Sequence, residues 1–165
     1  MTSQLRPQAE AGYGVHREST IEVRSPAKIN VFLEVLGKRN DGFHELETVM
    51  LRTSLHDVLR FETSISGQLS LRPADYSPPE LAETFPLDDS NLILRAAQAL
   101  REHTQTHQGA AITVNKRIPP EAGLAGGSSN AATTLLALNR LWGLDLPKQT
   151  LHEIAASLGS DINFF

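Results

Sequence analysis

Apolar and polar residues alternate along the first half of the chain, and this pattern predicts strands. The stretches that alternate or are rich in β-branched residues are 21–24, 29–36, 46–55, 58–61 and 67–71. Pro26 falls between the first two stretches and is expected to interrupt them. The Asp41-Gly42 pair is a strong turn signal, so two strands joined by a turn are expected around it.

The second half of the chain shows helical spacing instead. Apolar residues from Leu92 to Leu100 predict a helix with Ser90 as its N-cap. Further helices are expected to open at Ser128 and Pro147, with a short strand at 111–114 before them. Residues 72–86 hold four of the nine prolines and are expected to form a loop. Because strands come first and helices later, the expected class is α+β.

Both ends of the chain lack helical periodicity. Residues 1–19 have no apolar segment of the kind that a secretory signal needs, and their acidic residues are atypical of transit peptides. A disordered leader and a cytoplasmic location are therefore expected. Residues 161–165 are expected to begin a strand. Because Phe164 and Phe165 form an unusually apolar terminus, the chain is interpreted as the first part of a longer protein.

Composition narrows the choice of function. The 165 residues include 15 Lys and Arg against 19 Asp and Glu, so the net charge of -4 argues against nucleic-acid or membrane binding. The absence of cysteine excludes disulfides and thiolate-bound zinc. His103 and His107 have metal-ligand spacing, but they lie at a polar helix end, and no metal site is expected there.

A glycine-rich loop lies between the strand at 111–114 and the helix expected from Ser128. Gly123, Gly126 and Gly127 would let backbone N–H groups approach a ligand closely. The helix N-terminus behind them would add unpaired donors and a partial positive charge, which together favour a phosphate. A plain loop capped by a serine is the alternative. The loop matches neither the Walker A motif nor Gly-x-Gly-x-x-Gly.

Four separated motifs resemble the GHMP kinase superfamily. They are PAKIN at 26–30 with GKRNDGFH at 37–44, DDSNL at 88–92, PPEAGLAGGSSNAA at 119–132 and GSD at 159–161. The resemblance implies that residues 20–165 form the superfamily's N-terminal α+β domain, related to the second domain of ribosomal protein S5. It also implies that the C-terminal domain of the superfamily is absent from this chain.

The same resemblance implies an ATP- and Mg²⁺-dependent kinase of non-mevalonate isoprenoid biosynthesis. Its substrate would be cytidine diphosphate methylerythritol, phosphorylated at the 2-hydroxyl, and a homodimer is one option for its assembly. The implied catalytic residues are Lys28 and Asp161. The implied ATP-binding residues are Gly123, Leu124, Ala125, Gly126, Gly127, Ser128, Ser129, Asn91, Leu92 and Lys116. The implied substrate-binding residues are Asn30, Phe43 and His44, with the last two at the cytosine.

Two positions depart from the superfamily pattern. Glu121 stands where Gly or another small residue is common, and its side chain is expected to point to solvent. Asn163 stands where Pro is common, with little expected consequence. Three alternatives remain open: a non-catalytic nucleotide-binding module, a mevalonate-type or homoserine kinase, and an RNA-binding module. The acidic composition weighs against the RNA-binding module.

Overall fold

The computed structural model describes residues 19–38, 42 and 44–165. One mixed sheet contains its strands in the order β1 (Thr20–Lys38), β2 (His44–Ser64), β4 (Gly109–Asn115) and β3 (Leu69–Pro73). Strand β2 pairs antiparallel with both β1 and β4, whereas β3 and β4 run parallel. A parallel pair needs a crossover connection, and the chain between β3 and β4 supplies it.

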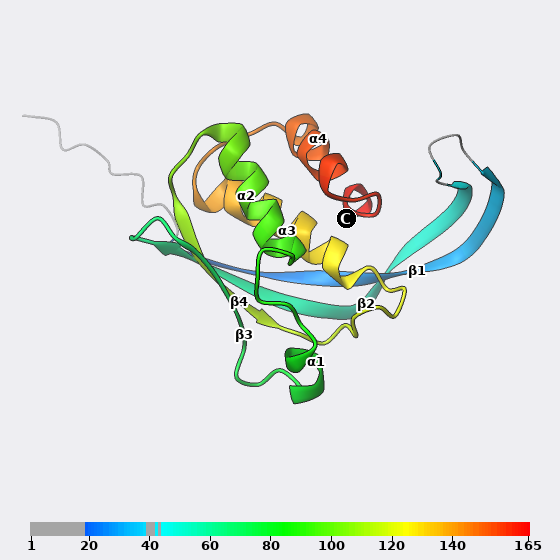
Figure 1. Cartoon of the computed structure of the whole chain (residues 1–165), viewed down its shortest axis with the longest axis horizontal. Coiled ribbons are helices and arrows are strands. Elements are labelled where there is room, and N and C mark those ends of the chain that lie inside the picture. Colours follow the sequence, from blue (N-terminus) through cyan, green and yellow to red (C-terminus); the bar gives the residue numbers. More distant parts are fainter. Residues whose placement is uncertain (1–18, 39–41, 43) are drawn as a thin grey trace, which may run out of the picture.

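Helices α2 (Leu92–Thr104), α3 (Gly126–Leu141) and α4 (Lys148–Leu158) cover one face of the sheet (Figure 1). Helix α2 belongs to the crossover between β3 and β4, together with the short α1 (Pro79–Glu83). A single 3₁₀ turn, η1 (Ile162–Phe164), follows α4. Strands precede most of the helices, as the sequence predicted, and the α+β class is confirmed.

The core lies between this face of the sheet and the helices. Period-two alternation places Leu59 and Phe61 of β2 toward the helices, where neither side chain is exposed. Ile112 and Val114 of β4 join the same cluster. Burying each such side chain contributes roughly 1.5–3 kcal/mol. Helix α3 contacts β1, β2, α2 and α4, so its N-terminal half is held on several sides.

The expected break at Pro26 does not occur. Residues 20–38 form one strand, and Pro26 stands opposite His56 in the ladder. The register shifts between Pro26 and Lys28, which marks an irregularity in the pairing. Strand β1 is an edge strand, and an edge tolerates the missing N–H of proline.

Three other boundary predictions were wrong. The N-cap of α2 is Asn91 rather than Ser90, and its side-chain oxygen accepts from Ile93 N–H. Helix α3 begins at Gly126, two residues before Ser128. The expected strand at the end of the chain is the 3₁₀ turn η1, because backbone bonds of the i to i+3 type close residues 159–165.

The remaining differences concern the proline-rich loop and the leader. The loop at 72–86 contains α1, which begins at Pro79, because proline fits the first turn of a helix. The expected leader at 1–19 lies outside the described residues except for Ser19, whose carbonyl accepts from Thr63 N–H at 3.1 Å. None of the described helices combines the length and the apolar character that crossing a bilayer requires.

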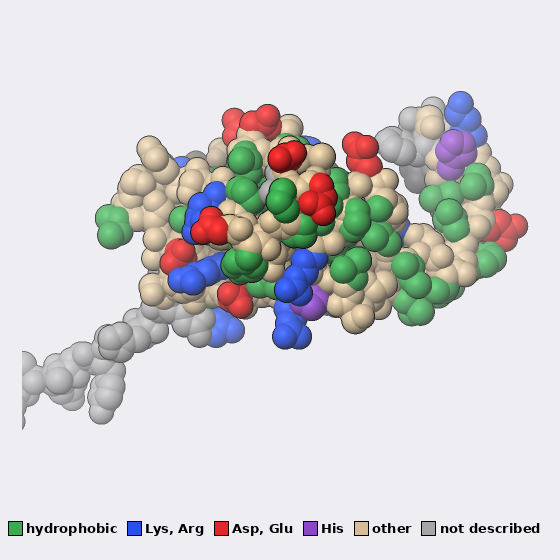
Figure 2. Space-filling model, turned by 90° about the horizontal axis from the view of Figure 1, so that it is seen from below, with side chains coloured by type: hydrophobic (Ala, Val, Ile, Leu, Met, Phe, Trp, Pro, Cys, Tyr) green, Lys and Arg blue, Asp and Glu red, His purple; other side chains and the backbone are tan. Residues whose placement is uncertain are grey.

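Strands β1 and β2 continue beyond the layer of helices as a two-stranded arm (Figure 1). The arm consists of residues 29–38 and 44–55, which pair only with each other, since β4 meets β2 from Val58 onward. Many of its apolar side chains are exposed: Val31, Leu33, Val35, Leu36, Leu46, Val49 and Leu51. Figure 2 shows hydrophobic side chains gathered along this arm.

The cap of α2 generates a test of the fold. Replacing Asn91 by Ala should lower the free energy of unfolding by about 1 kcal/mol, because Ile93 N–H loses its acceptor. Urea denaturation measures this change. Gln98→Ala at an exposed position of the same helix is the matched control and should change stability by less than about 0.5 kcal/mol. Equal stability of the two variants would contradict the role of the cap.

Candidate active site

The glycine-rich loop forms one wall of a pocket. Segments that are distant in the sequence form the rest: the chain before α2, Lys28 of β1, Lys116 after β4 and Asp161 at the start of η1. The lining residues are Lys28, Phe85, Pro86, Ser90, Asn91, Leu92, Lys116, Asp161 and the continuous run 119–128. Most residues implied at the ATP site therefore border one pocket, together with both implied catalytic residues.

The loop meets α3 in a conformation that only small residues permit. Ala125 has a left-handed backbone with φ of 53°, and Gly126 follows as the first helical residue. A Cβ on Gly126 would lie 2.9 Å from Ile118 Cγ2, so a side chain there cannot fit without displacing Ile118. The first backbone N–H groups of α3 have no partner within the helix, and they carry its partial positive charge. This arrangement suits an anion.

The structure brings Lys28 and Asp161 together at the pocket. Lys28 lies in β1, and its backbone N–H donates to Leu124 O of the loop at 3.0 Å. Its Nζ lies 3.6 Å from Asp161 Oδ2. The Lys28 side chain is 9% exposed and that of Asp161 is 39% exposed, so the carboxylate faces open space beside a nearly buried ammonium. A hydroxyl bound there could contact both groups.

Asn30 extends this pair along the arm. Lys28 Nζ donates to Asn30 Oδ1 at 2.5 Å, and Asn30 Nδ2 donates to Thr48 Oγ1 at 2.7 Å. The Thr48 hydroxyl in turn donates to Phe32 O at 2.8 Å. Thr48 was not predicted from the sequence, because its place beside Asn30 depends on the register of β1 and β2.

Two of the implied ATP-binding side chains are engaged by other buried side chains. Ser129 is fully buried, and its hydroxyl accepts from Ser25 Oγ at 2.7 Å, whereas Ser128 borders the pocket. Lys116 also borders the pocket, but its Nζ donates to Asp57 Oδ2 at 2.7 Å. Asp57 was not predicted, although it shares the inward-facing parity of Leu59 and Phe61 in β2.

The segment before α2 is fixed by its own polar bonds. Asn91 caps α2 through its oxygen, and its Nδ2 donates to Pro86 O at 2.5 Å. The Ser90 hydroxyl and the Ser90 N–H both donate to Asp88. These hydrogen bonds, and the one from the hydroxyl above all, hold the pKa of the Asp88 carboxyl below its ordinary value, although desolvation acts to raise it. Leu92 borders the pocket, and its Cδ1 would lie 3.4 Å from a Cβ on Gly127.

His44, one of the two residues implied at the cytosine, does not line this pocket. His44 is the first residue of β2 and stands opposite Lys38 at the far end of the arm. Arg52 stands opposite Lys28, so His44 is eight positions away along β2, or roughly 26 Å of extended strand. Phe43 lies outside the described residues. His103 and His107 join no cluster, because the described residues contain no group of three or more potential metal ligands.

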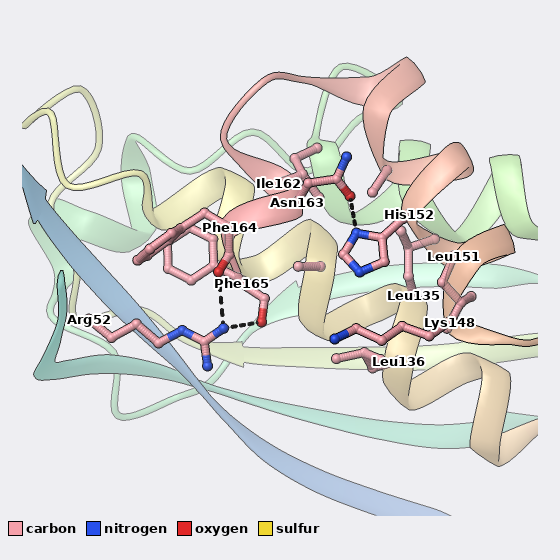
Figure 3. Close-up of a pocket in the computed structure, with 12 residues that line it drawn as sticks. Arg52, Leu135, Leu136, Lys148, Leu151, His152, Ile162, Asn163, Phe164 and Phe165 are labelled. Atoms are coloured by element: carbon pink, nitrogen blue, oxygen red, sulfur yellow. Dashed lines mark hydrogen bonds between the residues drawn. The ribbon is translucent and has the colours of Figure 1, made fainter. Parts of the chain in front are cut away.

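A second pocket lies between α3, α4 and the end of the chain (Figure 3). Arg52 reaches across it, donating to Phe164 O at 3.0 Å and to Phe165 O, and stacks against both rings. His152 Nδ1 lies 2.8 Å from Asn163 Oδ1 on the opposite wall. None of the residues implied from the sequence lines this pocket. Its contacts instead anchor η1, the turn that Asp161 begins.

The geometry agrees with comparisons to known proteins. Residues 91–164 match the family described as GHMP kinases N terminal domain. A 4-diphosphocytidyl-2-C-methyl-D-erythritol kinase of Prochlorococcus marinus (strain MIT 9301) is 49% identical over 145 residues, which are 88% of this chain and 44% of that protein. The kinase of the same name from Variovorax paradoxus (strain S110) is 47% identical, over 87% of this chain and 46% of its own length.

Comparison with solved structures also finds kinases. A crystal structure of 4-(cytidine 5'-diphospho)-2C-methyl-D-erythritol kinase superposes with a TM-score of 0.70 and 37% identity, over 88% of this chain and 48% of that one. Mevalonate kinase of Methanococcus jannaschii has a TM-score of 0.64 over 86% of this chain and 46% of its own, but only 17% identity, so it shows the fold alone. The chain spans about half the length of the curated relatives it matches.

Glu121 generates a prediction about the loop. It is exposed, borders the pocket and has a left-handed backbone with φ of 58°, a conformation that favours glycine. Glu121→Gly should therefore raise the free energy of unfolding by about 1 kcal/mol. Urea denaturation measures the gain. Glu121→Ala removes the carboxylate but keeps the Cβ, so it is the matched control and should not show the gain. Equal stabilisation by both variants would refute the backbone explanation.

Proposed function

We propose that the chain belongs to the GHMP kinase superfamily and carries the ATP-binding and catalytic residues of a 4-diphosphocytidyl-2-C-methyl-D-erythritol kinase. The reaction is transfer of the γ-phosphoryl group of ATP to the 2-hydroxyl of the methylerythritol part of the substrate. The observation that carries the proposal is the meeting of Lys28 and Asp161 beside the glycine-rich loop. The identity of 47–49% to relatives of that name supports the choice of substrate.

The two charged residues divide the chemistry between them. Asp161 orients the substrate hydroxyl toward the γ-phosphorus and accepts its proton as the new P–O bond forms, and ADP leaves. Lys28 places a positive charge 3.6 Å from that carboxylate, where it stabilises negative charge on the transferred group. The backbone bond from Lys28 N–H to Leu124 O fixes the distance between the lysine and the loop. Positioning and charge supply most of the catalysis.

The loop and the N-terminus of α3 fit the phosphates of ATP. They offer backbone N–H donors, and the Ser128 hydroxyl borders the same space. A bound Mg²⁺ would supply positive charge to the phosphates. Ser128 and Asp161 offer the hydroxyl and carboxylate oxygens that a hard cation prefers. Leu92 and the chain before α2 supply an apolar surface for the adenine.

The substrate extends along the arm in this proposal. Asn30 lies between Lys28 and Thr48 and can hold hydroxyl groups of the methylerythritol. Phe43 and His44 bind the cytosine at the far end, by stacking and by hydrogen bonding to the base edge. Because His44 is far from the pocket along β2, a GHMP kinase acting on a smaller alcohol is the second candidate. A comparison of cytidine diphosphate methylerythritol with mevalonate and homoserine as phosphate acceptors separates the two.

The charge distribution disfavours the RNA-binding alternative. Figure 2 shows the molecule from the side opposite the helices, where Lys and Arg are interspersed with Asp and Glu. A pocket on the sheet is lined by Glu22, Arg60, Glu62, Arg72 and Asp75, which carry both signs of charge. This part of the described surface therefore lacks the single-sign basic stripe that phosphate-backbone binding requires.

The catalytic pair generates the central prediction. Asp161→Asn keeps the shape of the side chain and removes its charge, so kcat should fall by about 10²–10⁴-fold while both KM values change little. Lys28→Ala should also lower kcat. In the double variant the combined loss should be smaller than the product of the single losses, because the two groups act as one unit. A coupled assay for ADP release measures these constants.

The matched control for this experiment is Asp145→Asn, which changes an exposed carboxylate outside the pocket lining. Its kcat should equal that of the wild-type protein. Wild-type kcat in Asp161→Asn would refute the assignment of the base. Strictly multiplicative losses from Lys28→Ala and Asp161→Asn would show that the two residues act independently.

The arm generates a separate prediction about specificity. His44→Ala should raise the KM for the cytidine substrate about tenfold, since a hydrogen bond to the base edge is lost, and leave the KM for ATP unchanged. Initial-rate kinetics with each substrate varied in turn measure both constants. His103→Ala on α2 is the control and should change neither constant. A rise in the KM for ATP alone would move His44 to the nucleotide site.

A further inference from the structure

Asp57 is a carboxylate buried in the core of the domain. It lies in β2 on the same face as Leu59 and Phe61, and its side chain has no exposed surface. A carboxylate in such a place is costly unless donors surround it. Four groups donate to it: Lys116 Nζ at 2.7 Å, Arg117 N–H at 2.7 Å, Ile118 N–H at 2.8 Å and Asn130 Nδ2 at 3.0 Å.

These donors come from both ends of the glycine-rich loop. Lys116, Arg117 and Ile118 directly precede Pro119, where the loop begins, and Asn130 lies near the start of α3, where the loop ends. One carboxylate of β2 therefore holds the entry and the exit of the loop. The residues between them include two left-handed positions that are not glycine, Glu121 and Ala125, which a chain without such anchors would readily leave.

The Lys116 ammonium also lies next to Gly126, the first residue of α3. Its Nζ would be 3.3 Å from a Cβ on Gly126, and it donates to Ile118 O at 2.5 Å as well as to Asp57. Ile118 in turn contacts the same side of Gly126. The position of the Gly126 backbone is thus set by two residues whose own positions depend on Asp57.

We propose that Asp57 is a positioning residue for the nucleotide, acting through Lys116, Ile118 and Asn130 on the backbone of the phosphate-binding loop. The inference rests on the proposed function, in which this loop binds the phosphates of ATP. Backbone N–H donors bind an anion strongly only when they converge on it before it arrives. Without the Asp57 bonds, the loop and the first turn of α3 lose their common anchor.

Asn130 offers a way to test geometry separately from charge. Its Nδ2 donates to Asp57, and its Oδ1 has no hydrogen-bond partner among the described residues although the side chain is 1% exposed. In Asp57→Asn the new amide can donate to that oxygen once the Asn130 amide turns over. Lys116 then has no counter-ion, and the additional change Lys116→Met removes that unpaired charge.

The experiment is titration of the purified protein with Mg·ATP by calorimetry, at a temperature where every variant is folded by circular dichroism. Asp57→Asn should weaken Mg·ATP binding at least tenfold. Asn130→Ala is a milder change that keeps the ion pair of Asp57 with Lys116, and it should weaken binding about threefold. Asp57→Asn combined with Lys116→Met removes the unpaired charge and should restore the Tm but not the affinity, because Lys116 is one of the residues through which Asp57 acts on Gly126. Trp142→Phe removes a distant buried hydrogen bond to Gly109 O and serves as the stability control.

A purely structural role would lower the Tm of Asp57→Asn, as Trp142→Phe should, and leave the Kd for Mg·ATP at the wild-type value. That result overturns the inference. If Asp57→Asn does not fold, wild-type affinity for Mg·ATP in Asn130→Ala overturns it instead. Recovery of the affinity together with the Tm in the combined variant also overturns it, because Asp57 would then affect binding only through stability. Absence of Mg·ATP binding by the wild-type protein would contradict the proposed function and this inference with it.

Discussion

The bonds to the buried carboxylate of Asp57 tie the sheet to the loop and to α3. Removing one partner of such a buried ion pair typically costs about 3–5 kcal/mol, because the other charge is left without compensation. Here the two charges, Asp57 and Lys116, are 0% and 4% exposed and have no access to solvent as a substitute. One hydrogen-bonded network therefore joins β2, both ends of the glycine-rich loop and the start of α3.

Strand β4 and the helices accompany only one part of the long β1–β2 pair. Where β4 and the helices accompany β2, alternation buries Leu59 and Phe61 and fixes the register. Beyond Val58 toward the turn, β1 and β2 pair only with each other in the sheet, and apolar residues such as Val35 are exposed. Lys28 lies where these two parts meet, which places the proposed catalytic pair between the glycine-rich loop and the arm proposed to hold the substrate.

The elements of the fold could be predicted to a large extent from local patterns. Alternation predicted the strands, helical spacing predicted α2, α3 and α4, and the order of elements predicted the α+β class. The errors lie where a local signal was overruled by a neighbour in space. Pro26 continues a strand because β1 is at the edge of the sheet, and Asn91 rather than Ser90 caps α2 because Ser90 is engaged by Asp88.

In the candidate site, the features that follow from local sequence patterns are even more clearly separate from those that depend on the tertiary structure. The sequence alone determined the glycine-rich loop, its place before a helix and the four motifs, since these depend on residue types at short spacing. Only the tertiary structure decided that Lys28 and Asp161 meet, that Ser129 turns inward to Ser25, and that Asp57 holds the loop. Each of these contacts joins residues 59 or more positions apart, and such contacts depend on strand register and helix packing, which no local pattern encodes.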